Sequence, residues 1–301
     1  MGLKLGLPRW NGDVKTMVAR IIPGAIGAGI YQVNMLVDMI IATLLPTGSI
    51  SFLFYADRIN QLPLGVVGVA VGTALLPMMS RQLRGGDEKG AMNSLNRALE
   101  FSLLLSLPAG VAYMVIADPI VSILFERREF SASDTQATAA ALFVYALGLP
   151  AYVLNKALTP GFFARGNTKT PVKIAAICMI VNIVFNLILM GPFQHVGLAM
   201  ATVISAWTNT ILLAIVLRKN GYLVLDKRLL DRIWRIATAC LVMAGALFGL
   251  SHLLQTELTG SQLMRILSLC TLVGGGLLSY FACVFLFRAA RISEVKAMMR
   301  R

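Results

Sequence analysis

The stretch "ISFLFYADRINQLPLGVVGVAVGTALLPMM", residues 50 to 79, is apolar along most of its length. A run this long can cross a bilayer, because a spanning helix needs about 20 mostly apolar residues. Near its centre, however, stand Asp57, Arg58, Asn60 and Gln61. An ionisable side chain at the bilayer centre costs about 2.5–3.5 kcal/mol, so it has to face protein or a water-filled cavity. The stretch therefore predicts a membrane helix that carries a polar site.

The rest of the chain has the same apolar character. Hydrophobic residues make up 57% of it and charged residues only 14%, against about 25% in an average soluble domain. Eight runs are long and apolar enough to be transmembrane helices: residues 18–45, 50–79, 98–117, 135–156, 171–190, 197–217, 233–254 and 263–287. We therefore predict an all-α, polytopic membrane protein with eight transmembrane helices. The four cysteines fall within these runs and are expected to act as small buried hydrophobes.

Positive charge is concentrated in every second connection between the predicted helices. All but four of the 27 lysines and arginines lie in the N-terminal segment, in the second, fourth and sixth connections, or in the tail. Because cytoplasmic loops are enriched in Lys and Arg, both termini are predicted to be cytoplasmic. The basic runs are interpreted as topology determinants near anionic lipid rather than as a nucleic-acid-binding surface. The N-terminal apolar stretch is too short for a signal peptide, so no cleavage is expected.

Asp38 and Arg58 are expected at the same depth in the membrane. Each lies about ten residues from Gly48, the centre of the turn between the first two predicted helices. At 1.5 Å rise per residue, both lie roughly 10–12 Å below the outer boundary of a core about 30 Å thick. Two interpretations remain open. The two side chains form an ion pair that holds the hairpin together, or Arg58 faces a solvated cavity and binds an anionic group.

The second interpretation favours a phosphate, because the donor fork of a guanidinium engages two oxygens at once. Gln61 lies one turn beyond Arg58 on the same face of the helix, and Asp57 is its neighbour in sequence. Pro63 removes a backbone donor and frees the carbonyl of Ile59, a break that is tolerated where helices line a cavity. Arg58, Asp57 and Gln61 are therefore the candidate substrate-binding residues.

A second polar set follows further along the chain. Asn182 and Asn186 are spaced four residues apart on the fifth predicted helix, and Thr202 lies on the sixth. With Asp38 they offer one carboxylate and three neutral oxygens, which is the chemistry of a hard-cation site. The alternative is hydrogen bonding between helices, a common role of asparagine in membranes. No catalytic triad, phosphate-binding glycine loop or metal-binding cluster is apparent, so the sequence does not predict an enzyme.

Three stretches resemble a known family. Residues 54–82, "FYADRINQLPLGVVGVAVGTALLPMMSRQ", and 158–175, "LTPGFFARGNTKTPVKIA", are similar to signature stretches of the lipid II flippase family MurJ/MviN. Residues 191–205, "GPFQHVGLAMATVIS", resemble a hinge of the wider multidrug/oligosaccharidyl-lipid/polysaccharide exporter superfamily. The resemblance runs across essentially the whole chain, and the first two motifs are specific to the flippases.

This resemblance implies a carrier with two six-helix lobes around a central cavity, followed by two helices that form a lipid-tail groove. Residues 1–218 resemble the second lobe and residues 219–301 the two additional helices with a basic cytoplasmic tail, whereas the first lobe is absent from the chain. The resemblance also implies that Arg58 binds the diphosphate of lipid II. Sodium ligands of some members match the following positions: Asp38, Asn182, Asn186, Thr202 and the Leu198 carbonyl. Asn186 departs from the pattern, because an acidic residue can occur there.

We therefore expect the C-terminal part of a flippase that moves lipid II, the undecaprenyl-diphosphate-linked disaccharide-pentapeptide, across a bacterial inner membrane by alternating access. Its role would lie in peptidoglycan biosynthesis and cell shape, without chemistry on the substrate and with no cofactor other than sodium as a coupling ion. The expected partners are lipid II, membrane lipids and a missing N-terminal lobe, but no nucleic acid. The alternatives are a transporter of another polyprenyl-linked saccharide, a drug exporter, or a truncated membrane fragment that does not transport.

Overall fold

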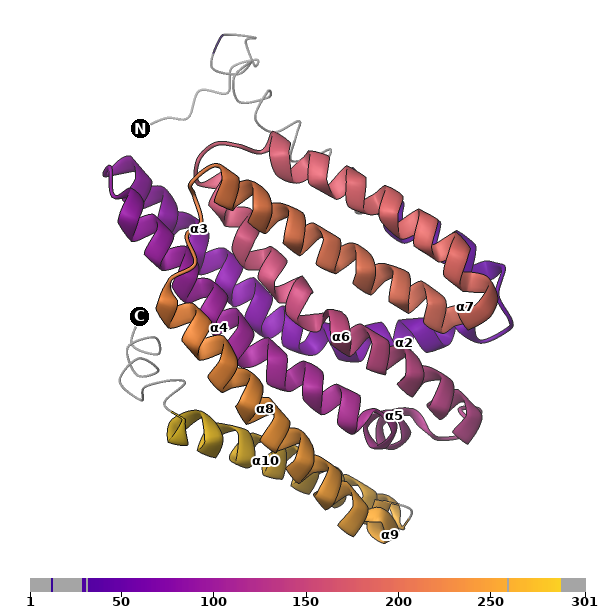
Figure 1. The fold of residues 1–301 in the computed structure, drawn as a ribbon. Helices are drawn as coiled ribbons and strands as arrows, with labels where there is room; N and C mark the ends of the chain where they lie inside the picture. The colour runs from indigo at the N-terminus through magenta and orange to yellow at the C-terminus, as the bar shows by residue number, and fades with distance from the viewer. Residues whose placement is uncertain (1–11, 13–28, 31, 259, 288–301) are drawn as a thin grey trace, which may run out of the picture.

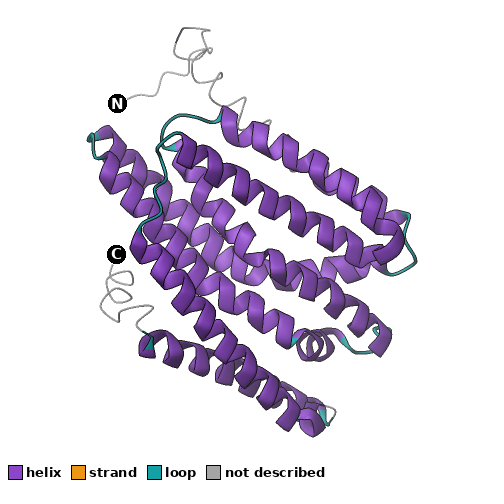
Figure 2. Cartoon of the chain, in the orientation of Figure 1, coloured by secondary structure: helices purple, strands orange, loops and turns teal. Residues whose placement is uncertain are grey.

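A computed structural model of the chain describes residues 12, 29–30, 32–258 and 260–287. Within these residues every regular element is a helix, joined by short loops (Figures 1 and 2). The elements, after a short helix Gln32–Thr43, are α2 (Ser49–Pro63), η1 (Leu64–Gly68), α3 (Val69–Arg84), α4 (Glu88–Val115), α5 (Ala117–Phe125), α6 (Ala132–Phe163), α7 (Lys169–Lys219), α8 (Lys227–Leu253), α9 (Gln255–Leu258) and α10 (Gln262–Leu286). The predicted all-α class is confirmed.

Six helices in the described part of the chain are long and apolar enough to cross a membrane, which makes this a multi-pass membrane protein. The longest, α7, covers two of the predicted helices, 171–190 and 197–217. The first predicted helix, 18–45, lies largely outside the described residues, and only Gln32–Thr43 of it is a described apolar helix. The count of eight spanning helices therefore stays a prediction.

The chain reverses direction inside α7, so that its two arms run side by side (Figure 1). Gln194 has φ 50° and ψ −130°, which is not helical, and Pro192 precedes it. At Gly197 a side chain could not be accommodated, because a Cβ there would lie 2.3 Å from the carbonyl oxygen of Leu189. The turn therefore requires glycine at this position, where the second arm closes against the end of the first.

Side-chain caps fix where three helices begin, because the first backbone N–H groups of a helix have no partner within it. Asp87 accepts a hydrogen bond from the Gly90 N–H at the start of α4, and Asp226 accepts one from the Leu229 N–H at the start of α8. At the start of α6, Ser131 and Asp134 cap each other's backbone. These polar caps mark the points at which the chain turns back into the apolar bundle.

Helix α6 is the most buried of the six candidate spans: 67% of its most apolar window is buried, against 22–33% in the others. One hydrophobic core joins it to α3, α4 and α7, through residues such as Leu95, Phe162 and Leu217. A second core joins it to α2, α5 and the second arm of α7. The helix therefore forms the axis around which the others are arranged.

The last two long helices, α8 and α10, pack on each other and on α4. The Tyr280 hydroxyl donates to the Leu104 carbonyl at 2.6 Å, and Arg265 donates to the Ser122 hydroxyl at 2.7 Å. These contacts attach the C-terminal helices to the preceding bundle. The predicted division into residues 1–218 and 219–301 stays a prediction, and the basic tail after residue 287 lies outside the described residues.

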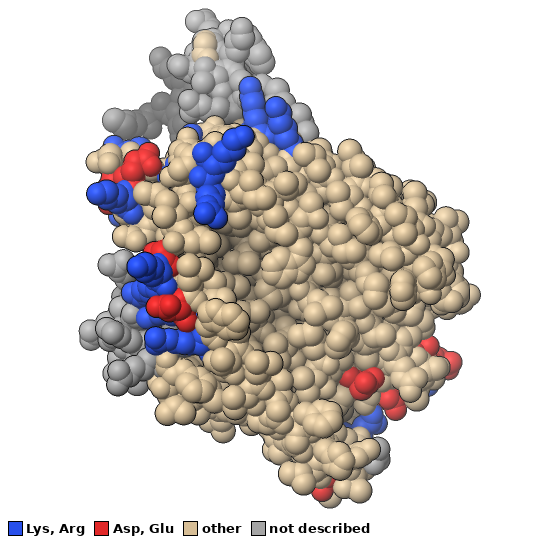
Figure 3. All heavy atoms as spheres, viewed as in Figure 1, with Lys and Arg blue, Asp and Glu red and all other residues tan. Residues whose placement is uncertain are grey.

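Charged side chains gather at the two ends of the bundle in the view of Figure 3, and the face between them is uncharged. That pattern suits helices that cross a bilayer. Several basic residues that the sequence assigned to connections lie inside helices instead: Arg97 in α4, Lys156 in α6, and Arg232 and Arg235 in α8. The assignment was wrong for these residues because the helices extend several turns beyond their most apolar segments. The basic residues before position 28 lie outside the described residues.

Candidate functional site

The helix that carries Arg58 is irregular one turn further on. Pro63 ends α2, and residues Leu64–Gly68 form a π-helical turn before α3 continues in the same direction. The Tyr113 hydroxyl on α4 donates to the Ile59 carbonyl at 3.1 Å. Because proline cannot donate to the carbonyl four residues before it, the tyrosine supplies a partner that the helix itself lacks. The predicted break at Pro63 is present only as a π-helical turn within one continuous helix from Ser49 to Arg84, and a neighbouring helix supplies a partner for the Ile59 carbonyl.

Arg58 is exposed and forms no ion pair with any described carboxylate. Its guanidinium carbon lies 4.7 Å from the centroid of the Phe54 ring, and its Nη1 lies 3.5 Å from the Gln61 side-chain oxygen. The Gln61 amide in turn donates to the Asp57 carboxylate. The three candidate substrate-binding residues therefore form one contiguous group on α2, with the Arg58 guanidinium free to bind an anion.

Asp38 does not pair with Arg58 in the described structure. Its carboxylate accepts hydrogen bonds from the side-chain amides of Asn34 at 3.2 Å and Asn186 at 2.6 Å. Asp38 is thus hydrogen-bonded to two asparagine amides instead of forming the ion pair with Arg58 that the sequence left open. The sequence could place Asp38 and Arg58 at one depth, but depth alone does not fix the direction in which each side chain points.

The candidate cation ligands are brought together only in part. Asn182 and Asn186 are both fully buried, and the Asn186 amide bridges Asp38 and the Asn182 oxygen, the latter at 2.9 Å. Thr202 instead donates to the Leu198 carbonyl at 3.0 Å within its own helix. Leu198 packs against Ile41 on the helix that carries Asp38. The arrangement is therefore the hydrogen-bonded network that the sequence left open as the alternative to a cation site.

The two central amides of this network each leave one buried atom without a partner. The Asn186 side-chain oxygen is buried and has no hydrogen-bond partner, and neither has the Asn182 side-chain nitrogen. Rotating both amides about their terminal bond would turn oxygen toward Asp38 and free the remaining acceptors, as a hard cation requires. Rotated in this way, Asp38, Asn182 and Asn186 would present oxygen atoms, which are the ligands that a hard cation such as sodium requires.

A pocket of about 550 Å³ opens beside this network, between α2, α3, α6 and both arms of α7. Its walls are mixed, with apolar residues such as Leu64, Val69 and Met179 next to many polar ones. The polar side chains that line it are Asn34, Asp57, Asn60, Gln61, Tyr152, Asn155, Lys156, Asn182, Thr202, Ser205 and Asn209. Asp57 and Gln61 thus face this pocket, which connects it to the Arg58 group.

Lys156 is a pocket residue at the end of the predicted helix 135–156, which the charge pattern counted with the fourth connection. It lies inside α6, and its side chain makes no hydrogen bond or ion pair with the described residues. Gly68 and Gly72 bring the neighbouring helix close to it: a Cβ on Gly68 would lie 3.2 Å from the Lys156 side chain, and one on Gly72 would lie 3.4 Å from its carbonyl oxygen. The small-residue spacing of these two glycines could have indicated a close helix contact here. It could not indicate that the contact would be with a lysine.

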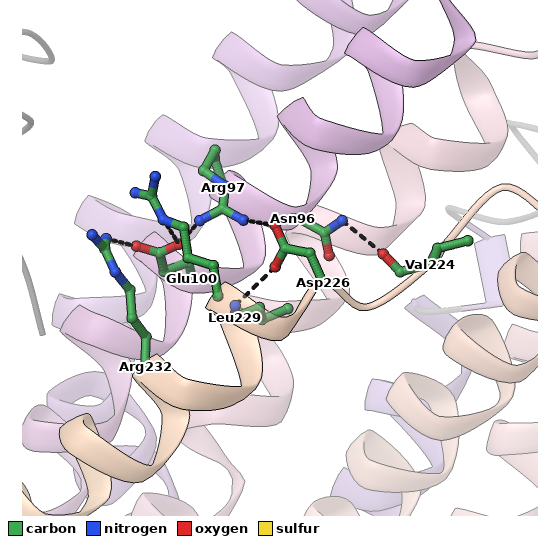
Figure 4. A network of polar contacts seen from close by, with 8 residues as sticks. Asn96, Arg97, Glu100, Val224, Asp226, Leu229 and Arg232 are labelled. Atoms are coloured by element: carbon green, nitrogen blue, oxygen red, sulfur yellow. Dashed lines mark hydrogen bonds and ion pairs between the residues drawn. The ribbon is translucent and has the colours of Figure 1, made fainter.

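A cluster of charges closes the end of the bundle at which α4 meets α8 (Figure 4). Glu100 on α4 accepts from Arg97 and from Arg232 of α8, and Arg97 also pairs with Asp226. Beside it, the Asn96 amide donates to the Val224 carbonyl at 2.8 Å. The cluster ties the segment before α8 to the bundle, so some of the basic residues interpreted as topology determinants also hold helices together.

The chain is similar to lipid II flippases in sequence. The family model "Lipid II flippase MurJ" matches residues 2–268. The chain is 41% identical over 304 residues to a probable lipid II flippase MurJ of Rhizobium meliloti, covering 100% of this chain and 57% of that protein. It is 36% identical to a counterpart from Vibrio cholerae, covering 96% and 56% respectively. The chain thus spans little more than half the length of these curated relatives.

The chain is also similar to solved structures of transporters. A lipid II flippase MurJ in an inward closed conformation superimposes with a TM-score of 0.73 at 27% identity, covering 89% of this chain and 53% of that one. An outward-facing multidrug resistance transporter of the MATE family and the MOP superfamily superimposes with a TM-score of 0.58 at 19% identity, covering 90% and 65%. At that identity the second similarity shows a shared fold alone.

Proposed function

The chain belongs to the lipid II flippase MurJ family, which is a family of transporters rather than enzymes, and we propose that it forms the C-terminal part of a flippase for lipid II. In this proposal it moves the lipid-linked peptidoglycan precursor outward across the bacterial inner membrane by alternating access. The substrate keeps its covalent structure throughout. The observation that carries the proposal is the exposed Arg58 guanidinium, held inside a membrane-spanning helix without a carboxylate partner.

A guanidinium at this depth needs an anion or water, because lipid tails offer neither. The diphosphate of lipid II supplies oxygens in pairs, which match the donor fork of arginine. Gln61 lies within 3.5 Å of the guanidinium and keeps it on the side of the helix that also faces the pocket. We therefore assign Arg58 to binding of the diphosphate, and Asp57 and Gln61 to positioning around it.

Transport by alternating access requires a second wall for this site, since one repeat of such a carrier moves against the other. The chain spans 57% of a curated relative and 53% of the solved flippase. We propose that the chain has eight spanning helices and that six of them, within residues 1–218, form one lobe. A further lobe would face Arg58. Residues 219–301 would add two helices for the lipid tail.

Sodium is the coupling ion in this proposal. Asp38, Asn182, Asn186, Thr202 and the Leu198 carbonyl would hold it, and its positive charge would compensate the half-buried carboxylate of Asp38. The support is the donor set itself, together with the two amide atoms that have no partner. We further propose that both termini are cytoplasmic, since the connections rich in Lys and Arg alternate along the chain.

The test is rescue of a cell depleted of its own flippase by this chain, co-expressed with a matching N-terminal six-helix lobe. We expect rescue by the wild-type pair, none by Arg58→Ala, and poor rescue by Arg58→Lys, which keeps the charge but lacks the fork. Arg84→Ala serves as the control, because Arg84 lies at the end of the same continuous helix and donates only to the Ser80 carbonyl. Full rescue by Arg58→Ala at equal protein level would contradict the proposed function.

A further inference from the structure

We propose that the end of the bundle at which α4 meets α8 is a binding site for an anionic phospholipid. The lipid phosphate would lie against Lys227 and Arg228 at the start of α8, and the acyl chains would lie along the apolar face of the same helix. The residues of this site do not line the pocket beside Arg58. The inference goes beyond the proposed function, because it does not depend on which substrate the chain transports.

The first argument is an exposed apolar stripe along α8. Four large side chains in it are 48–76% exposed: Leu230, Trp234, Leu241 and Phe248. They are spaced four or seven residues apart, which places them on one face of the helix. In a helix that is long and apolar enough to cross a membrane, such a face lies against lipid tails. α8 therefore offers a surface for acyl chains that continues to its charged end.

Trp234 indicates the depth of this stripe in the membrane. Tryptophan is enriched where lipid tails meet headgroups, because its ring is apolar and its N–H needs a polar partner. Arg235 is the next residue, and Arg228 lies six residues nearer the start of α8, which is about 9 Å along the helix axis. Long basic side chains extend toward the headgroups from such positions. The cations at the start of α8 are therefore within reach of lipid phosphates.

The second argument is an excess of positive charge around this end of α8. Five basic side chains lie in residues 226–235 and on the facing turn of α4, against three carboxylates. The basic residues are Arg97, Lys227, Arg228, Arg232 and Arg235, and the acidic ones are Glu100, Asp226 and Asp231. Even when each carboxylate compensates one cation, two positive charges are left for an anion from outside the chain.

Burial divides these charges into an inner pair and an outer pair. The side chains of Glu100 and Arg232 are only 8% and 11% exposed, and they form the inner pair (Figure 4). Arg228 is 45% exposed, although its Nε lies 3.5 Å from the Glu100 Oε2. Lys227 is exposed and forms no ion pair with any described carboxylate. The inner pair holds the start of α8 in place, and the outer cations are the ones that a lipid headgroup can contact.

An anionic phospholipid uses both the charges and the stripe. A free phosphate would contact the cations but not the apolar face. A zwitterionic lipid would cover the apolar face, but its own cationic group compensates its phosphate. Each Lys or Arg near an anionic membrane surface contributes roughly fivefold in affinity. An excess of two positive charges therefore predicts a preference of at least about tenfold for the anionic lipid.

The experiment titrates the purified 301-residue chain in detergent with phosphatidylglycerol or phosphatidylcholine of identical acyl chains, and counts the bound lipid by native mass spectrometry. We expect phosphatidylglycerol to bind at least about tenfold more tightly. The double variant Lys227→Gln with Arg228→Gln should reduce this preference to less than about threefold. Arg84→Gln with Lys89→Gln is the matched control, because it removes two exposed cations from the hairpin of α3 and α4 and leaves α8 unchanged. The control should keep the preference within about twofold of the wild type.

Lys227→Glu provides a second variant in case the loss of Arg228 loosens α8. It reverses one exposed charge and leaves the Glu100 contacts in place, so it should lower the preference at least about fivefold without a change in Tm. Equal affinity of the wild-type chain for both lipids would overturn the proposal. Equal losses in the test and control variants would overturn it too, since they would show only a general attraction to the charged end.

A competition experiment distinguishes a lipid from a free phosphate. Glycerol phosphate in excess should leave phosphatidylglycerol bound, because it has no acyl chains to cover the apolar stripe. Displacement by glycerol phosphate would assign the site to a free phosphate and overturn the lipid as its ligand.

Discussion

Replacing Glu100 by alanine tests how strongly α8 is held against α4. Glu100 accepts hydrogen bonds from Arg97 and Arg232 (Figure 4). The Arg228 Nε lies 3.5 Å from the Glu100 Oε2. The side chains of Glu100 and Arg232 are only 8% and 11% exposed, whereas Arg97 and Arg228 are 26% and 45% exposed. The bond between Glu100 and Arg232 is therefore the most buried contact that Glu100→Ala would remove.

The magnitude follows from this difference in exposure. Removing one partner of a buried pair costs about 3–5 kcal/mol, whereas an exposed pair contributes about 0–1 kcal/mol. Because Arg232 keeps a small exposed surface, we expect Glu100→Ala to lower the free energy of unfolding by about 3 kcal/mol, which is roughly a hundredfold in the unfolding equilibrium. At about 2 °C per kcal/mol for a long chain, Tm should fall by about 6 °C.

The assay is thermal unfolding of the purified chain in nanodiscs, followed by tryptophan fluorescence. Glu88→Ala is the control, because Glu88 is 60% exposed and its pair with Arg165 is 3.4 Å long. Arg165 is itself only 8% exposed, but it keeps the Gly161 carbonyl and the Tyr222 ring as partners, so the change should cost less than about 1 kcal/mol. The double variant Glu100→Gln with Arg232→Met should recover most of the loss, since it removes both charges of this buried pair. Equal losses for Glu100→Ala and Glu88→Ala would refute the reasoning from burial.

Three further outcomes are expected. In a chain without its native cysteines, a membrane-impermeant reagent applied from outside should label a cysteine placed at Thr47 but not one at Gly85; equal labelling would contradict the topology, because one continuous 36-residue helix separates the two positions. Sodium should raise the Tm of the wild-type chain more than equimolar choline does, and Asp38→Ala should abolish the difference; an identical response in both proteins would exclude the cation site. Gly197→Ala should destabilise strongly, since its Cβ would lie 2.3 Å from the Leu189 carbonyl oxygen, whereas Gly245→Ala, with nothing within 4 Å, should be nearly neutral; thermal unfolding distinguishes the two.

The helical membrane class was predictable from the sequence because it depends on run length and composition, which do not require knowledge of contacts. The break at Pro63 was predictable for a similar reason, since proline acts on its own helix. The pair formed by Glu100 and Arg232 was not, because 132 positions separate the two residues and only the packing of α8 on α4 brings them together. Local sequence patterns predict local structure, but they do not predict which charges pair between helices that are far apart in the sequence.

Small residues and cysteines show the same limit. Gly68 and Gly72 are spaced four residues apart and contact α6, whereas Gly245 and Gly249 have the same spacing and no atom within 4 Å of an added Cβ. The cysteines were all expected to be buried, but Cys270 is exposed. Exposure of an apolar or small residue costs little on a surface that faces lipid, so composition does not distinguish the lipid face of a membrane helix from its packed face.

The amide at position 186 explains how the Asp38 carboxylate is hydrogen-bonded without a cation. As asparagine, it donates to Asp38 and to Asn182 at once, which a carboxylate at that position could not do. A second carboxylate there would face Asp38 within hydrogen-bonding distance, and the two charges would repel each other unless a cation or a proton intervened. Compared with a carboxylate, the asparagine therefore lowers the negative charge around a bound sodium ion. It also stabilises the network when no sodium is bound. The sodium-dependent rise in Tm measured on this chain should accordingly depend on rotation of the two amides rather than on relief of repulsion between carboxylates.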